Sequence, residues 1–315
     1  MKPKNLIPVL INYDRLSDPS ENLKATLIGD GIFMLSPNPL PAVVRAQIGR
    51  EHRLLFDLPE DKKRAHICAL KSGRRGYIPF AVEQGQAHMA PDPKEGWHIS
   101  REPRDSTENR RFYIENFWPK ELQTFAPVFQ SLYRDCDRIS TELIRAIARS
   151  FGFAAYGESL AFEANGVLRL LRYRRRSQTA LAAPHTDIGL FTLHLHRTGQ
   201  PCEVFIDGKW RALEAPEDAL VVLTGEMLMR VTSGLVRAPL HRVPEATEES
   251  YREFAGFFAH PNPQAILRSQ CPDGPVQFRD ICGLEMLYRR AEDMAIADYS
   301  SSEVQSATTL LLARP

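Results

Sequence analysis

The sequence Leu168-Arg169-Leu170-Leu171-Arg172-Tyr173 opens the part of the chain that decides the fold. From here to residue 259, turn residues separate short runs of alternating apolar and polar side chains, a pattern typical of half-buried strands. The runs are 168–173, 189–195, 203–206, 209–213, 220–223, 236–243 and 252–259. Asp207-Gly208 stands between two of them and favours a tight hairpin. Seven short strands at this spacing predict a β sandwich or barrel.

Helical patterns flank this β region. The clearest covers 121–151, where apolar residues recur every three or four positions until Gly152. Further helices are predicted over 17–29, 41–56 and 283–299, and short strands over 6–11 and 32–35. We therefore expect a mostly β fold whose core is buttressed by N-terminal and C-terminal helices.

The segment 71–119 is polar and interrupted by glycine and proline, which predicts an irregular, lid-like surface. No internal repeat or low-complexity linker divides the chain. We expect residues 1–120 to form an N-terminal region of strands, helices and this irregular segment. Residues 121–315 then hold the long helix, a β core at about 165–262 and the last helix, and both regions form one compact unit.

Composition excludes several classes of protein. The 315 residues are 43% hydrophobic, and 40 Lys and Arg balance 39 Asp and Glu, so the net charge of +1 would not attract nucleic acid or an anionic membrane. The chain has neither an apolar run of about 18 residues nor a signal sequence, and we expect a cytoplasmic enzyme. Its five cysteines have no C-x-x-C spacing, which disfavours disulfides and zinc ribbons.

A short motif carries the chemistry. His185 and Asp187 are two positions apart, so in an extended segment their side chains emerge on one face. His241 follows 54 residues after Asp187 on another predicted strand, and a folded sheet could bring it beside the pair. Two histidines and one carboxylate form the facial set that holds non-haem Fe(II). The alternative for each histidine alone is an ordinary structural role.

The chain resembles the isopenicillin N synthase-like branch of the Fe(II)/2-oxoglutarate-dependent dioxygenases. The resemblance covers nearly the whole chain, and its motifs occur in the family's order. They are Ile7-Pro8-Val9, Gly31-Ile32-Phe33, Arg75-Gly76-Tyr77, Asn116-Phe117-Trp118-Pro119, Leu170-Leu171-Arg172-Tyr173, Pro184-His185-Thr186-Asp187-Ile188-Gly189, Asp207-Gly208-Lys209-Trp210, Gly225-Glu226-Met227-Leu228 and Pro239-Leu240-His241-Arg242-Val243.

The resemblance implies a fold and a cofactor set. The fold is a distorted jelly-roll, the double-stranded β-helix, with iron at its open end. The implied cofactors are Fe(II), 2-oxoglutarate as co-substrate and O₂. His185, Asp187 and His241 stand at the positions of the iron ligands. The implied reaction hydroxylates, desaturates or cyclises a small organic molecule, for example in secondary metabolism, and releases succinate and CO₂.

The resemblance also places the co-substrate. Arg252 stands where the family grips the distal carboxylate of 2-oxoglutarate, and Tyr173 where it presents a tyrosine to co-substrate or substrate. Alternation puts Arg252, Phe254 and Phe258 on one face, pointing into the barrel. The family usually has Arg-x-Ser, but this chain has Arg252-Glu253-Phe254, so one donor to that carboxylate is either missing or supplied by another residue.

Four residues are predicted to contact the substrate. Arg169 shares a strand face with Tyr173, and Phe80, His98 and Phe258 are predicted pocket walls. Packing or a framework salt bridge is the alternative for each.

Three rival functions remain open. One is an Fe(II) oxidase of the same fold that uses no 2-oxoglutarate, with Arg252 holding a carboxylate of the substrate. The others are a non-catalytic metal-binding protein and a Zn²⁺ hydrolase, although the sequence offers no obvious general base for the latter.

Overall fold

Two facing β-sheets and a layer of helices make up the structure, a computed structural model that describes residues 5–18, 23–68, 75–83, 91–103, 114–173, 180–245 and 251–293. The larger sheet has the strand order β1 (Val9–Asn12), β2 (Ile32–Ser36), β10 (Leu220–Thr224), β7 (Phe191–Arg197), β12 (Arg252–Ala259), β5 (Val167–Tyr173), β4 (Lys94–Ser100) and β3 (Gly76–Ile78). The smaller sheet has the order β6 (Ala180–His185), β11 (His241–Glu245), β8 (Glu203–Ile206) and β9 (Lys209–Ala212). Strands β13 (Ile266–Leu267) and β14 (Ile281–Cys282) form a separate ribbon. This is the jelly-roll that the sequence predicted, with β1 to β4 from the N-terminal region extending its larger sheet.

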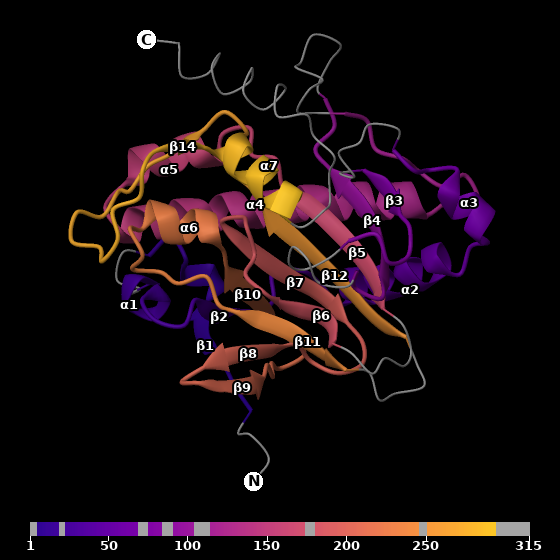
Figure 1. Cartoon of the computed structure of the whole chain (residues 1–315), viewed down its shortest axis with the longest axis horizontal. Coiled ribbons are helices and arrows are strands. Elements are labelled where there is room, and N and C mark those ends of the chain that lie inside the picture. The colour runs from indigo at the N-terminus through magenta and orange to yellow at the C-terminus, as the bar shows by residue number, and fades with distance from the viewer. Residues whose placement is uncertain are drawn as a thin grey trace.

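Helices cover the outer face of the larger sheet. Figure 1 shows the long helix α4 (Phe125–Ser150) crossing behind the strands. The remaining helices are α1 (Leu23–Leu27), α2 (Ala42–Phe56), α3 (Glu60–Arg64), α5 (Ala154–Ala161), α6 (Glu226–Val231) and α7 (Gly283–Asp293), with a 3₁₀ turn at Tyr13–Arg15. Helix α4 contacts α1, α2 and α5 as well as β4 and β12. It therefore joins the N-terminal helices to the jelly-roll.

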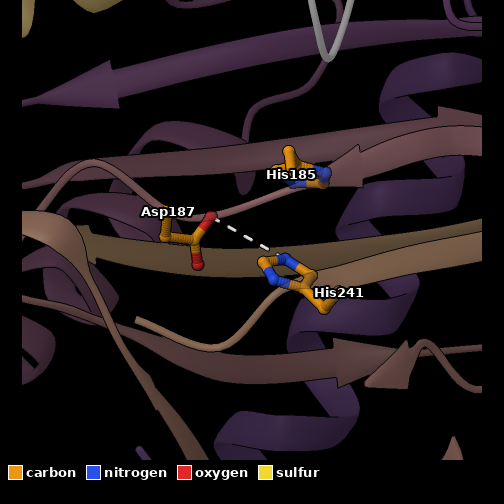
Figure 2. A group of neighbouring side chains, drawn as sticks. All are labelled: His185, Asp187 and His241. Carbon is orange, nitrogen blue, oxygen red and sulfur yellow. Dashed lines mark ion pairs between the residues drawn. The ribbon is translucent and has the colours of Figure 1, made fainter. Parts of the chain in front are cut away.

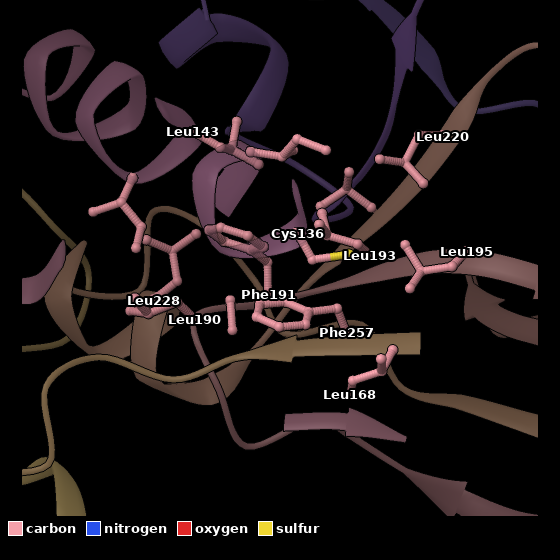
Figure 3. Close-up of a cluster of buried hydrophobic side chains, with 14 of the residues drawn as sticks. Cys136, Leu143, Leu168, Leu190, Phe191, Leu193, Leu195, Leu220, Leu228 and Phe257 are labelled. Atoms are coloured by element: carbon pink, nitrogen blue, oxygen red, sulfur yellow. The ribbon is translucent and has the colours of Figure 1, made fainter. Parts of the chain in front are cut away.

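Two apolar layers lie on the two faces of the larger sheet. On the helix side, Cys136 and Leu143 of α4 pack against Leu193 and Phe257 from central strands (Figure 3). Between the two sheets, a second cluster includes Leu181, Val204 and Leu223. Burying each such side chain stabilises the fold by about 1.5–3 kcal/mol, so these layers hold the strands that carry the site.

Several predicted elements need correction. The helix predicted over 17–29 is reduced to α1 within the described residues, and β11 begins only at His241 because Pro239 cannot donate a ladder hydrogen bond. The long helix begins at Phe125 rather than 121, and α7 covers 283–293 of the predicted 283–299, with the remainder outside the described residues. The hairpin turn is confirmed, since Asp207 and Gly208 both adopt positive φ between β8 and β9.

The segment 71–119 is not wholly irregular. It contains β3 and the fully buried strand β4, which pairs with β5 along its whole length. All five cysteines are free, as the sequence predicted. In the described part of the chain, no helix is both long and apolar enough to cross a membrane.

Candidate active site

Three side chains meet at one end of the jelly-roll. His185 ends β6, Asp187 follows in the next loop, and His241 begins β11 (Figure 2). One potential ligand atom from each lies within 4.8 Å of the others. Because β6 and β11 pair with His241 opposite His185, the sheet register itself brings the two rings together, with centroids 4.3 Å apart.

Backbone carbonyls orient both histidines. Nδ1 of His185 lies 2.7 Å from the carbonyl of Ala183, and Nδ1 of His241 lies 3.1 Å from that of Pro239. Since a carbonyl only accepts, each Nδ1 is assigned the proton and each Nε2 keeps its lone pair. Nε2 is therefore the nitrogen that each ring can offer to a metal.

The loop at Asp187 is held from two directions. The Thr192 hydroxyl donates to Asp187 Oδ2 over 2.6 Å, while Oδ1 lies 3.9 Å from His241 Nε2. The backbone N–H of Glu226, at the start of α6, donates to the Asp187 carbonyl over 2.9 Å. Gly225 permits this approach, because a Cβ there would lie 2.9 Å from the same carbonyl oxygen. The carboxylate is thus presented with one oxygen bonded and the other directed at the histidines.

The surroundings favour the protonation states that bind metal. Burial and the nearby His241 lower the pKa of His185, which keeps it neutral. Burial opposes ionisation of Asp187, but the two histidines and the Thr192 hydrogen bond outweigh it, and its pKa is lowered. Neutral imidazoles and an ionised carboxylate are the forms that ligate a metal.

The three residues open into a cavity that also contains the buried cation of Arg252. Arg252 is 3% exposed, and among the described residues no carboxylate pairs with it. Its Nε donates to the Gln200 carbonyl over 3.1 Å, and its guanidinium lies 4.9 Å from the Tyr173 ring centroid. Within the described part of the chain, its buried Nη1 has no hydrogen-bond partner. Burial accordingly lowers the pKa of Arg252. An anionic ligand would complete this site.

The structure places the other predicted residues as follows. Tyr173, Arg169, His98 and Phe258 all line the cavity. Phe80 is not among the described lining residues: it lies in the turn after β3, the outermost strand of the larger sheet, and its contact with the substrate stays a prediction. Arg172 faces away from the cavity, as alternation predicted, and pairs with Glu95 on the helix side.

Sequence reasoning missed several residues of the cavity wall. Glu83, Asp92 and Lys94 line it from the segment predicted to be irregular, and Leu287 of α7 contributes an apolar contact. His194 and His260 also line it. Burial lowers the pKa of His194 to about 3, so it is neutral beside Asp187. No clear signal in the sequence marked Glu83, Asp92 or Lys94, because charged residues in a polar segment are usually solvated.

A jelly-roll with two histidines and one carboxylate at its open end is the architecture of a non-haem iron oxygenase. Comparison with known proteins agrees. The family model described as non-haem dioxygenase in morphine synthesis N-terminal matches residues 10–121, and that of the 2OG-Fe(II) oxygenase superfamily matches 164–261.

Individual relatives support the same family. The chain is 26% identical over 238 residues to the 2-oxoglutarate-dependent dioxygenase thnC of Trichoderma harzianum, covering 72% of this chain and 74% of that protein. It is 28% identical over 242 residues to the 2-oxoglutarate-dependent dioxygenase traH of Penicillium crustosum, covering 72% and 73%.

Solved structures share the fold. A 2OG-Fe(II) oxygenase family protein from Caulobacter crescentus superposes with a TM-score of 0.78 at 26% identity, covering 90% of this chain and 98% of that one. A Neurospora crassa protein in complex with alpha-KG and thymine gives 0.77 at 22% identity, covering 93% and 98%. The chain therefore belongs to the Fe(II)- and 2-oxoglutarate-dependent dioxygenases, oxidoreductases that use Fe(II), 2-oxoglutarate and O₂.

Proposed function

We propose that His185, Asp187 and His241 hold Fe(II), and that Arg252 and Tyr173 hold 2-oxoglutarate in the same cavity. The enzyme then hydroxylates, desaturates or cyclises a small organic molecule, with release of succinate and CO₂. The thymine bound to the Neurospora crassa protein supports a compound of this size as substrate.

Arg252 carries the proposal, because no carboxylate of the described residues pairs with it. A guanidinium buried this completely without a carboxylate partner is costly unless a ligand supplies the anion. The distal carboxylate of 2-oxoglutarate is such an anion, and it can accept two parallel hydrogen bonds from the guanidinium. The Nη1 atom, which has no partner among the described residues, is the donor that this contact needs.

Phe254 changes how that carboxylate is held. It occupies the position of the family's usual serine and packs edge-on against His194, with ring centroids 5.0 Å apart. Since phenylalanine donates no hydrogen bond, Arg252 and Tyr173 must supply most of the polar contact. We therefore expect co-substrate binding to depend strongly on Arg252.

Bound iron and 2-oxoglutarate would supply the oxidising power that breaks a C–H bond of the substrate. The chain's own residues keep His185 neutral and Asp187 ionised, and they orient Asp187 through Thr192. Phe254, Phe258 and Leu287 exclude water from the cavity, which protects the reaction from side processes.

The first test is an anaerobic titration of the apoprotein with Fe(II) and then 2-oxoglutarate, following the visible charge-transfer band of a chelated keto acid. We expect the band to form. Iron binding without a band would instead favour an oxidase in which Arg252 holds a carboxylate of the substrate.

The second test replaces the proposed anchor. Arg252→Gln removes charge-assisted hydrogen bonds of about 1.5–3 kcal/mol, so we expect the 2-oxoglutarate dissociation constant to rise about ten- to hundredfold. Fe(II) affinity should change little. Arg268→Gln is the matched control, because Arg268 is exposed and pairs with Asp280 far from the cavity lining. Equal co-substrate affinity in the wild type and Arg252→Gln would contradict the proposal.

A further inference from the structure

A cluster of paired charges forms the wall of the cavity on β4 and β5. Lys94 and His98 point from β4, and Arg169 points from β5 directly opposite His98 in the sheet register. Glu83 and Asp92 join them from the chain before β4, held together by the backbone hydrogen bond from Asp92 N to the Glu83 carbonyl, 2.8 Å long. The proposed iron and 2-oxoglutarate sites use none of these five residues.

The cluster is electrically balanced. Lys94 Nζ lies 2.7 Å from Asp92 Oδ2 and 3.5 Å from Glu83 Oε2. Arg169 donates through Nη2 to the same Glu83 oxygen. Two cations thus face two carboxylates, and in this wall neither Lys94 nor Arg169 is left to neutralise a carboxylate of the substrate.

One acceptor in this balanced cluster remains open. Glu83 is 4% exposed, and its Oε1 is buried without a hydrogen-bond donor among the described residues. The nearest ring nitrogen, His98 Nε2 at 3.7 Å, accepts a 2.9 Å hydrogen bond from Arg169 Nε and so has no proton to donate. A buried carboxylate oxygen without a donor is costly, which points to a ligand that supplies one.

Glu83 is ionised under ordinary conditions. Burial opposes ionisation, but Arg169 and Lys94 outweigh it and lower the pKa of Glu83 to about 2. Its Oε1 can therefore only accept a hydrogen bond.

Building on the proposed function, we infer that the substrate is an uncharged molecule that donates an O–H or N–H hydrogen bond to Glu83 Oε1. A carboxylate would meet this negative oxygen with no free cation beside it among the described residues, and an ammonium would lie next to Lys94 and Arg169. The body of the substrate would contact the apolar parts of the lining, Val167, Ile188, Phe258 and Leu287. Arg169, predicted from sequence to contact substrate, then acts by positioning Glu83.

Matched probe sets test this inference on the holoenzyme. Each probe set has one ring, benzene or naphthalene, which carries a hydroxymethyl group, its methyl ether, a carboxylate or an aminomethyl group. Each probe is titrated anaerobically into the protein loaded with Fe(II) and 2-oxoglutarate. Binding is followed by calorimetry and by the shift of the visible band. We expect the hydroxymethyl probes to bind at least about tenfold more tightly than the other three types.

A charge-removing variant should change this order. In Glu83→Gln the amide oxygen remains the acceptor for Arg169, so the NH₂ group replaces Oε1 and offers a donor. We expect the alcohol-over-ether preference to be lost and carboxylate binding to tighten about tenfold, because the two cations now exceed the acids by one. Glu158→Gln, at an exposed residue of α5 paired with Arg145, is the control and should keep the wild-type order.

The outcomes separate the two proposals. Failure to form the visible band before any probe is added counts against the proposed function. With the band formed, tighter binding of ethers, carboxylates or amines to the wild type overturns this inference. The absence of binding by every hydroxymethyl probe at millimolar concentration also overturns it, whether or not the variant folds.

Discussion

Thr192 shows how a single hydroxyl can determine metal affinity. It is 1% exposed, and its hydrogen bond to Asp187 Oδ2 fixes the carboxylate that faces the two histidines. Thr192→Val keeps the side-chain shape but removes the donor, so we expect Fe(II) affinity to fall about ten- to hundredfold. Anaerobic competition with a colorimetric chelator measures this change.

Two further variants make the Thr192 experiment decisive. Thr192→Ser restores the hydroxyl and should recover most of the wild-type Fe(II) affinity, while Asp187→Ala gives the reference without the carboxylate. If Thr192→Val binds Fe(II) as tightly as the wild type, the hydroxyl does not position the carboxylate.

At the residue scale, the sequence predicts a side chain best when local geometry decides where it points. The i, i+2 spacing put His185 and Asp187 on one face, and strand alternation turned Arg252 inward. The sequence did not predict that Glu83 and Lys94 line the cavity. Charged residues in a polar segment are usually solvated, and only the folded chain brings these two within ion-pair distance.

At the element scale, segments with a clear apolar period were predicted well, including the short strands β8, β10 and β12, whereas a strand without that period was not. Helix α4 repeats its apolar stripe over seven turns, so tertiary contacts only trim its first residues. Strand β4 carries Lys94, Glu95 and His98 with both faces buried, which removes the apolar alternation on which strand prediction depends. The short helix α6 is fixed instead by its backbone contacts to the Asp187 loop.

The outward face of β4 makes a testable contribution to stability. Glu95 accepts hydrogen bonds from Lys63 Nζ at 2.6 Å, Tyr77 Oη at 2.8 Å and Arg172 Nε at 3.0 Å, tying α3, β3 and β5 to β4. Glu95→Ala leaves two buried cations without this partner, so we expect the free energy of unfolding to fall by about 3–5 kcal/mol.

Equilibrium urea unfolding measures the Glu95→Ala effect. Glu158→Ala is its control, because that carboxylate lies on the surface and its ion pair is screened by solvent, so it should cause a much smaller change. A Glu95→Ala free energy of unfolding close to that of Glu158→Ala would show that the network adds no stability.

At the scale of the whole molecule, the larger sheet has polar side chains on both faces. One face lines the cavity, and the other carries a buried group of charged and histidine side chains beneath α2. Arg252 of β12 faces the cavity, while its neighbour Glu253 faces α2 and lies 3.5 Å from His196 Nε2 and 3.9 Å from His52 Nδ1. His52, fully buried on α2, also hydrogen-bonds through Nε2 to the Leu171 carbonyl of β5 over 3.1 Å. The helix layer is thus bonded to the strands whose other face lines the cavity.

This buried histidine gives the apoprotein a predictable pH dependence. Burial lowers the pKa of His52 to about 4, whereas an unfolded chain would protonate it near its usual value of about 6.5. Between these values the unfolded state binds more protons, so His52 alone makes the free energy of unfolding fall as the pH falls, by up to about 1.4 kcal/mol per pH unit. Glu253 does not change this pH dependence in the upper part of the window, because its pKa is lowered in the folded chain and the carboxylate takes up protons only below about pH 4.5.

Urea unfolding of the chelator-treated apoprotein between about pH 7 and pH 5 tests this dependence. We expect the free energy of unfolding to decrease as the pH falls. In His52→Gln the decrease should be less steep, by about the contribution of one proton, because the variant lacks the titrating ring. His66→Gln is the control. The His66 ring is partly exposed, and burial lowers its pKa less than that of His52. The pH dependence of the free energy of unfolding in His66→Gln should therefore stay closer to that of the wild type. If the free energy of unfolding changes with pH equally steeply in the wild type and His52→Gln, His52 is protonated in the folded chain as readily as in the unfolded chain. The ring would then be in contact with solvent, and the helix layer would not be closed over the sheet.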